Sequence, residues 1–85
     1  MNFQLYHDSF TSAMAEAVRV ATSKGFTIDE TDWFNKVTVG PKRPSEGITN
    51  RYIIALLKDG KESKKALAVQ VYGMKVKYEL NCYVF

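Results

Sequence analysis

Apolar and polar residues alternate with a helical period in the first third of the chain. One apolar stripe recurs at intervals of three and four residues between about Asp8 and Lys24, the spacing of one face of an amphipathic helix. Asp8 or Ser9 can cap the start of this helix, and Gly25 stands where a left-handed residue commonly follows a helix end. The stripe consists of Phe10, Ala13, Met14, Ala17, Val20 and Ala21.

The second half of the chain changes to a period of two, which is typical of strands with one buried face. Strands are expected at Arg51–Lys58 and Lys64–Tyr72, joined by Asp59-Gly60, a strong hairpin signal. Because the helical stripe needs an apolar surface to cover, we predict an α+β fold with one N-terminal amphipathic helix packed on an antiparallel β-meander of three to four strands. The last strand would hold the alternating residues Val76, Tyr78, Leu80, Cys82 and Val84.

The segments between these elements are shorter and less regular. Met1–Tyr6 alternates weakly and is expected to form a short edge strand, and Phe26–Ile28 is expected to be extended. Asp29–Lys36 fits either a single helical turn or a wide turn, whereas Val37–Val39 is rich in β-branched residues and is expected to be a brief strand. Residues 40–50 are expected to form a long loop, because glycines and prolines interrupt any regular structure there.

Length and composition narrow the class of protein. The 85 residues fit a single domain, residues 1–85, and the 46% hydrophobic content is too high for a disordered chain. No apolar run approaches the roughly 20 residues that span a bilayer. No basic segment followed by an apolar one marks a signal peptide. We therefore expect no membrane partner and a cytoplasmic location.

Few residue types that catalysis needs are present. The one cysteine, Cys82, lies in an apolar-alternating stretch and is expected to be buried and unreactive. The one histidine, His7, has no second ligand type nearby for a metal. The acidic group Asp29, Glu30 and Asp32 fits a helix start or solvated surface better than a cation site. We expect no metal and no cofactor, and a binding protein rather than an enzyme.

Charge is distributed unevenly along the chain. Residues 1–35 carry a net charge of −3 and residues 36–85 a net charge of +6, which favours an anionic partner for the second half. Basic side chains neutralise phosphates, and aromatic rings can stack on unpaired bases. The leading hypothesis is therefore a non-enzymatic module that contacts nucleic acid through a basic loop, residues 40–51. Its expected contact residues are Lys36, Lys42, Arg43 and Arg51, with Trp33 as the stacking residue.

Aromatic residues on the strands support a second hypothesis. Residues of opposite parity in a strand point to opposite faces, so one helix cannot cover all of the strand tyrosines. If one sheet face is uncovered, some of these rings would be exposed there, as is common in protein interfaces. The chain would then be a protein-binding module, or would form a homodimer. The expected contacts are Tyr52, Tyr72, Tyr83 and Phe85.

Three segments of the second half are similar to small proteins of tailed bacteriophages. They are Val39–Tyr52, with the sequence VGPKRPSEGITNRY, Lys64–Met74, with KKALAVQVYGM, and Lys77–Val84, with KYELNCYV. The resemblance covers about residues 37–85 and transfers no activity and no functional residue. It implies a phage or mobile-element origin, and hence the host cytoplasm. It also favours binding of nucleic acid or of a host protein, such as an enzyme or defence complex that the protein would inhibit.

Overall fold

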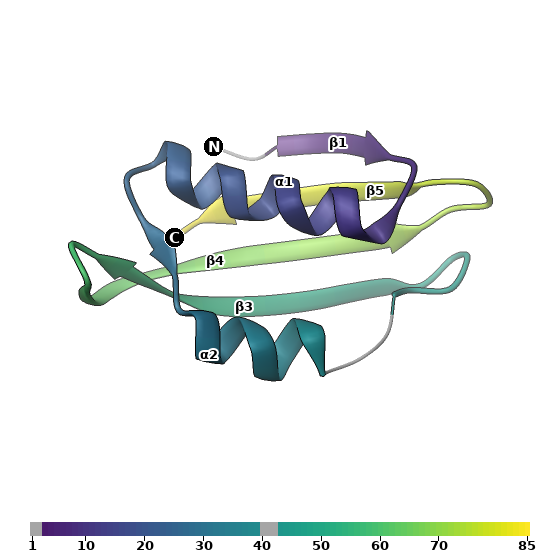
Figure 1. Cartoon of the computed structure of the whole chain (residues 1–85). Helices are drawn as coiled ribbons and strands as arrows, with labels where there is room; N and C mark the ends of the chain where they lie inside the picture. The colour runs from purple at the N-terminus through teal and green to yellow at the C-terminus, as the bar shows by residue number, and fades with distance from the viewer. Residues whose placement is uncertain (1–2, 40–42) are drawn as a thin grey trace.

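An antiparallel sheet with helices on one face forms the fold (Figure 1). The computed structural model describes the backbone of residues 3–39 and 43–85 and the side chains of residues 8–39 and 43–85. The strand order in the sheet is β1-β5-β4-β3-β2. The elements are β1 (Phe3–His7), α1 (Phe10–Ser23), β2 (Thr27–Ile28), α2 (Glu30–Trp33), the π-helix η1 (Phe34–Thr38), β3 (Thr49–Lys58), β4 (Lys61–Gly73) and β5 (Tyr78–Val84).

The predicted α+β class is confirmed, and so is the β3–β4–β5 meander. Two short strands enlarge the sheet: β1 pairs with β5 at one edge, and the two-residue β2 pairs with β3 at the other. No helix among the described residues is long and apolar enough to cross a membrane.

Local chemistry accounts for the ends of α1. The Ser9 hydroxyl oxygen accepts a hydrogen bond from the backbone N–H of Ser12 at 3.0 Å and so caps the first turn. Gly25 follows the helix with a φ of +89°, a conformation that few residues other than glycine adopt. Both features agree with the predicted helix.

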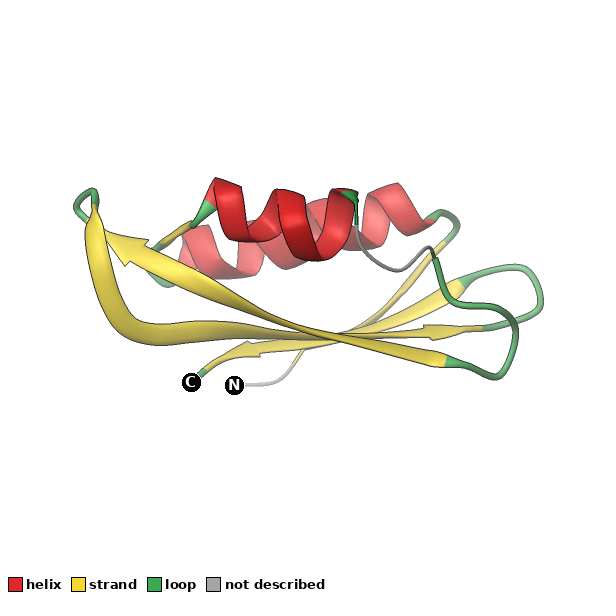
Figure 2. Ribbon diagram, turned by 90° about the horizontal axis from the view of Figure 1, so that it is seen from below, coloured by secondary structure: helices red, strands yellow, loops and turns green. Residues whose placement is uncertain are grey.

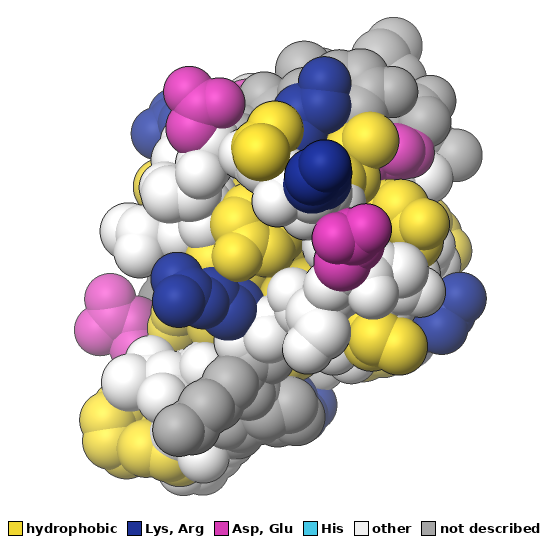
Figure 3. All heavy atoms as spheres, turned by 90° about the vertical axis from the view of Figure 1, so that its right-hand side faces the viewer, with side chains coloured by type: hydrophobic (Ala, Val, Ile, Leu, Met, Phe, Trp, Pro, Cys, Tyr) yellow, Lys and Arg dark blue, Asp and Glu magenta, His cyan; other side chains and the backbone are white. Residues whose placement is uncertain are grey.

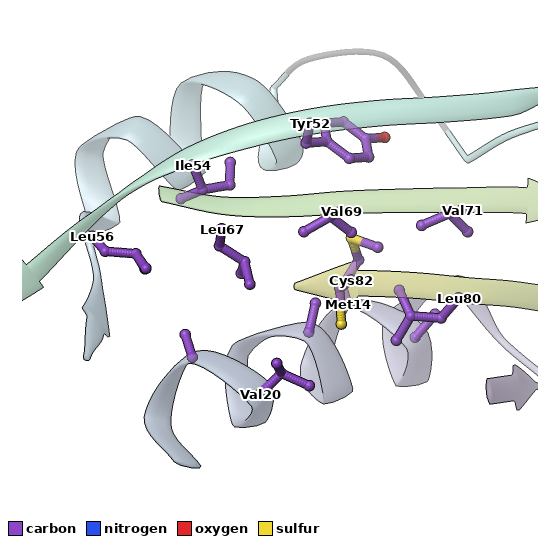
Figure 4. Packing of buried hydrophobic residues seen from close by; sticks show 13 residues of the cluster. Met14, Val20, Tyr52, Ile54, Leu56, Leu67, Val69, Val71, Leu80 and Cys82 are labelled. Carbon is purple, nitrogen blue, oxygen red and sulfur yellow. The ribbon is translucent and has the colours of Figure 1, made fainter. Parts of the chain in front are cut away.

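The core lies between α1 and one face of the three long strands, as Figure 4 shows. Alternate residues of each strand point toward the helix, and the apolar stripe of the helix packs against them. This arrangement leaves the residues of opposite parity on the other face of the sheet. The buried strand residues are Tyr52, Ile54 and Leu56 of β3, Leu67, Val69 and Val71 of β4, and Leu80 and Cys82 of β5.

The β3–β4 hairpin turns at Asp59 and Gly60, which both have a positive φ, +53° and +78°. Two consecutive residues of this kind define the type I′ turn that suits the twist of a hairpin. Just before the turn, Ala55 pairs with Ala66 but Leu57 pairs with Glu62, so the β4 strand contains extra residues. The sheet bends at this irregularity toward the helices (Figure 2).

The predicted strand at Val37–Val39 is wrong, because residues 34–38 form the π-helix η1. Asp29 caps α2, whose last turn continues directly into η1. Trp33 and Val37 are four residues apart and both pack against the core. The packing of this pair outweighs the local preference of valine for strands.

Side chains of α2 and η1 cover the edge of β3 beyond β2. The Asp32 carboxylate accepts a hydrogen bond from the backbone N–H of Ala55 at 2.8 Å. The Lys36 ammonium donates to the backbone carbonyl of Ile53 at 2.7 Å and lies 3.1 Å from Asp32 Oδ2. Two side chains thus occupy backbone positions that a further strand would otherwise use.

Candidate functional site

Both helical segments lie on the same side of the sheet, and the other face carries no helix (Figure 2). We call this second side the outer face. Its residues are Thr49, Arg51, Ile53 and Ala55 of β3, Ala66, Ala68, Gln70 and Tyr72 of β4, and Glu79, Asn81, Tyr83 and Phe85 at the C-terminal end.

One half of the outer face is polar and hollowed. Strand pairing aligns its six residues in two rows of three across β3, β4 and β5. They line a depression of about 330 Å³, which we call the polar hollow. This volume is at the lower end of the range for small-molecule sites, about 300–1,000 Å³. The rows are Thr49, Tyr72 and Glu79, and then Arg51, Gln70 and Asn81.

Several hydrogen-bonding groups in the polar hollow, but not that of Glu79, lack partners within the described part of the chain. Asn81 Oδ1 is shielded from solvent and accepts no hydrogen bond. The side chains of Arg51, Gln70 and Tyr72 also make no hydrogen bond or ion pair with the described residues. An unsatisfied buried polar group costs about 1–3 kcal/mol, so the hollow is suited to a polar ligand that supplies the missing partners.

The other half of the outer face is apolar and aromatic. Ile53 and Phe85 are each about half exposed, at 49% and 53%. The rings of Tyr83 and Phe85 lie side by side, with centroids 5.8 Å apart and planes inclined by 53°. Together with Tyr72 of the polar hollow, which is 39% exposed, this half supplies flat surfaces for stacking or for protein contact.

The described residues of the predicted basic site come together only in part: Lys36 and Arg51 line one hollow of about 400 Å³, but Arg43 does not. Arg51 lies on the outer face, whereas Arg43 lines a different hollow at the end of the sheet, of about 440 Å³. That hollow also holds Asp8 and Glu46 beside Lys75 and Lys77. Figure 3 looks at this end of the molecule and shows acidic, basic and apolar side chains intermixed. The loop end is therefore less clearly an anion site than its sequence indicates.

The other predicted contacts are used elsewhere or lie outside the described residues. Lys36 is held by Asp32 and the backbone of β3 at the sheet edge. Trp33 is partly buried against the core and lines a groove between α1 and η1, on the opposite side of the sheet from Arg51. Lys42 lies outside the described residues.

Gly73 anchors the second part of the predicted loop. The Gly73 carbonyl accepts a hydrogen bond from Gly47 N–H at 2.8 Å, and the Gly73 N–H donates to the Ile48 carbonyl at 2.9 Å. Pro44 is buried. This part of the loop is therefore packed against the end of β4.

Three of the four predicted aromatic contacts lie on the outer face. Tyr72, Tyr83 and Phe85 share it, but Tyr52 does not: its side chain belongs to the buried core cluster and is only 5% exposed. Tyr52 has even parity in β3, like Ile54, and the helix-facing register places it in the core. Its inclusion in the contact surface is wrong.

The cysteine and two of the acidic residues considered as reactive or metal-binding groups have structural roles instead. Burial, with a smaller contribution from the charge of Glu16, raises the pKa of the Cys82 thiol to about 11. Asp29 caps α2, and Asp32 binds the β3 backbone, so these two acidic residues stabilise local structure. Among the described residues, no three His, Cys, Asp or Glu side chains are grouped as metal ligands.

Gln70 and Asn81 were not singled out by the sequence. The alternation did indicate that both side chains lie on the face opposite the apolar ones, because Gln70 stands between Val69 and Val71, and Asn81 between Leu80 and Cys82. Only the register of β4 against β5 brings them opposite each other.

Comparisons of the chain with models of protein families, with curated proteins and with solved structures find no match. The outer face, with its polar hollow and its aromatic half, therefore stands on its own geometry as the candidate functional site.

Proposed function

We propose that the protein binds single-stranded nucleic acid on the outer face of its sheet. The observation that carries this proposal is the combination of exposed aromatic rings and unpartnered polar side chains on one uncovered face. Aromatic side chains stack on unpaired bases, and amide and guanidinium groups bind base edges. A duplex buries the base faces in its stack and uses the Watson–Crick edges for pairing, so a single strand, which offers both, is the expected ligand.

Charge supports the same partner. The outer-face set holds one basic residue, Arg51, and one carboxylate, Glu79, and the second half of the chain as a whole has a net charge of +6. Arg51 on the outer face is the basic residue best placed to contact a phosphate beside the stacked bases. This proposal moves the contact surface from the basic loop to the sheet, and it keeps Arg51, Tyr72, Tyr83 and Phe85.

Fluorescence anisotropy with labelled 12-nucleotide strands of DNA and RNA, and with matching duplexes, tests the proposal at 50 and 200 mM salt. We expect tighter binding to single strands and weaker binding at the higher salt concentration. Tyr72→Ala and Tyr83→Ala should each lower the affinity by about 5- to 150-fold, the range for loss of one stacked base. Arg51→Gln should lower the affinity and reduce the salt dependence.

Matched variants separate the outer face from the rest of the surface. Phe34→Ala removes an exposed aromatic ring from η1, and it should bind like the wild type. Arg43→Gln removes a basic residue from the loop end and tests the original loop site. Equal affinity of the wild type and all outer-face variants, or no binding at 50 mM salt, would refute the proposal.

A protein partner is the second candidate, and the apolar half of the outer face favours it. Ile53, Tyr83 and Phe85 would form the centre of such an interface, with a host protein or a second copy as partner. Sedimentation velocity over a concentration series detects the second copy. If Ile53→Lys abolishes self-association while Tyr72→Ala leaves it intact, the result supports the protein partner. The outer face would then be occupied by a second copy and would not be open to nucleic acid.

A further inference from the structure

The two edges of the sheet differ in how they are protected from further strand pairing. At the β3 edge, the two-residue β2 pairs with part of the strand, and the side chains of Asp32 and Lys36 bind the backbone next to it. At the opposite edge β1 pairs with β5, and no element of the described chain lies beyond it (Figure 1). Open backbone N–H and C=O groups along a strand are a template for another strand.

β1 lacks the features that usually protect an edge strand. Its sequence, FQLYH, contains no lysine, arginine, aspartate, glutamate or proline. Its pairing with β5 runs from Phe3 to His7 without a bulge, and five residues are an ordinary strand length. The β1 edge is therefore suited to pairing with one more strand.

We infer that β1 pairs with β1 of a second copy of this chain, so that two sheets continue as one in a dimer. The second copy is the favoured partner because a strand without charged residues can face itself without placing like charges opposite each other. Two identical antiparallel strands are related by a twofold axis, which gives a closed dimer. The protected β3 edge then keeps the sheet from extending to further copies.

One register pairs all five residues of both β1 strands. In it Leu5 faces Leu5 of the second copy, and the flanking pairs are Phe3 with His7 and Gln4 with Tyr6. Odd-numbered positions of β1 pair with the helix-facing positions of β5, and this register matches odd with odd. Both helical sides therefore lie on one side of the joint sheet, and both outer faces lie on the other.

The helices leave room for this pairing. α1 packs most extensively on β5, the neighbour of β1. In the dimer the two β5 strands lie three strand spacings apart, about 14 Å. Packed helices need only about 8–10 Å between their axes, so the two α1 helices do not collide.

Sedimentation velocity between about 5 and 500 µM tests the dimer. A five-residue pairing is smaller than a standard protein interface, so we expect a weak dimer that dissociates within this concentration range. The double variant Gln4→Lys/Tyr6→Lys places lysine opposite lysine and should weaken self-association by about tenfold or more. The variant Gln4→Lys/Tyr6→Glu places opposite charges in the same pairs and should restore it.

Two results of this experiment overturn the inference. One is a wild type that stays monomeric at the highest concentration, and the other is undiminished association of the double-lysine variant. Ile53→Lys is the matched control, because it adds a charge to the outer face rather than to the β1 edge, and it should dimerise like the wild type. Loss of the dimer in Ile53→Lys alone would assign self-association to the outer face and also overturn edge pairing.

Amide hydrogen exchange of the wild type follows the β1 edge directly and needs no variant. Alternate N–H groups of β1 point away from β5, so they are open in the monomer and hydrogen-bonded in the dimer. They should exchange several-fold more slowly at about 500 µM than at about 5 µM, whereas the exposed turn at Asp59 and Gly60 should exchange equally at both. Equal exchange of the β1 amides while sedimentation shows a dimer overturns the inference.

Discussion

Gly73 shows how a single residue can hold a loop in place. A Cβ atom at this position would lie 2.2 Å from the Ser45 carbonyl oxygen and 2.7 Å from the Pro44 carbonyl oxygen. Both obstacles are backbone atoms, which cannot rotate away as a side chain can. Glycine is required here because the loop approaches β4 closely, and the same approach carries the hydrogen bonds to Gly47 and Ile48.

We predict that Gly73→Ala destabilises the protein by about 1–3 kcal/mol, the usual cost of forcing extra volume into packed structure. Urea unfolding followed by circular dichroism measures the change. Gly60→Asn is the control, because no atom lies within 4 Å of a Cβ there and asparagine tolerates the positive φ. An unchanged midpoint for Gly73→Ala would show that the loop is free to move away from β4.

The sequence predicts on which face of a strand each side chain lies, but it does not predict which residue lies opposite on the neighbouring strand. The alternation of Leu80 and Cys82 with Asn81 and Tyr83 correctly separates two faces of β5. The opposition of Gln70 and Asn81 depends on the register between strands, which the two connecting turns and the core determine together. For this reason the aromatic members of the outer face were predicted and its polar hollow was not.

At the scale of elements, α2 and η1 protect the sheet edge through Asp32. The hydrogen bond from the Ala55 N–H, assisted by the Lys36 charge, lowers the pKa of the Asp32 carboxyl despite some desolvation. A carboxyl whose pKa is lower in the folded state stabilises the fold above its unfolded pKa. That contribution is lost as the pH falls through the folded pKa.

We predict that Asp32→Asn lowers the free energy of unfolding at pH 7 by about 1–2 kcal/mol, because the charged hydrogen bonds weaken and the site is partly exposed. The difference from the wild type should shrink as the pH falls from the unfolded pKa, about 4, through the lower folded pKa, where the wild-type carboxyl also becomes neutral. Urea midpoints between pH 7 and pH 2.5 measure this. Glu62→Gln, an exposed carboxylate on β4, is the control; a pH-independent difference for Asp32→Asn would contradict the mechanism.

The one element whose type was predicted wrongly illustrates a limit of local propensity. Val37 and Val39 favour a strand when they are considered alone. Two pairs at a spacing of four, Trp33 with Val37 and Asp32 with Lys36, indicate a helix instead. The long elements were predicted because each repeats one period over many residues, whereas η1 is short and depends on its contacts with the core and with β3.

At the scale of the whole molecule, one core joins the helix and the three long strands. Cys82 lies in this core and is fully buried, and burial raises the pKa of its thiol to about 11. Reaction needs an exposed thiolate, so labelling of Cys82 should require unfolding of the domain rather than a local motion.

We predict that 5,5′-dithiobis(2-nitrobenzoate) modifies Cys82 slowly at pH 8, with a rate that rises with urea in parallel with global unfolding. The chain has one cysteine, so the signal is unambiguous. Ala15→Cys adds an exposed thiol on α1 and should show an additional fast phase. Fast, urea-independent labelling of the wild type would mean that β5 detaches from the sheet by itself.

The one-sided core has a consequence for how this protein can change over time. The buried core cluster lies on the helical side of the sheet, whereas Ala68 is the one member of the outer-face set that is buried. Substitutions on the outer face are therefore tolerated more readily than those in the core, and a lineage can exchange one binding specificity for another without rebuilding the scaffold. The same separation makes the sheet a convenient platform on which new recognition surfaces can be selected.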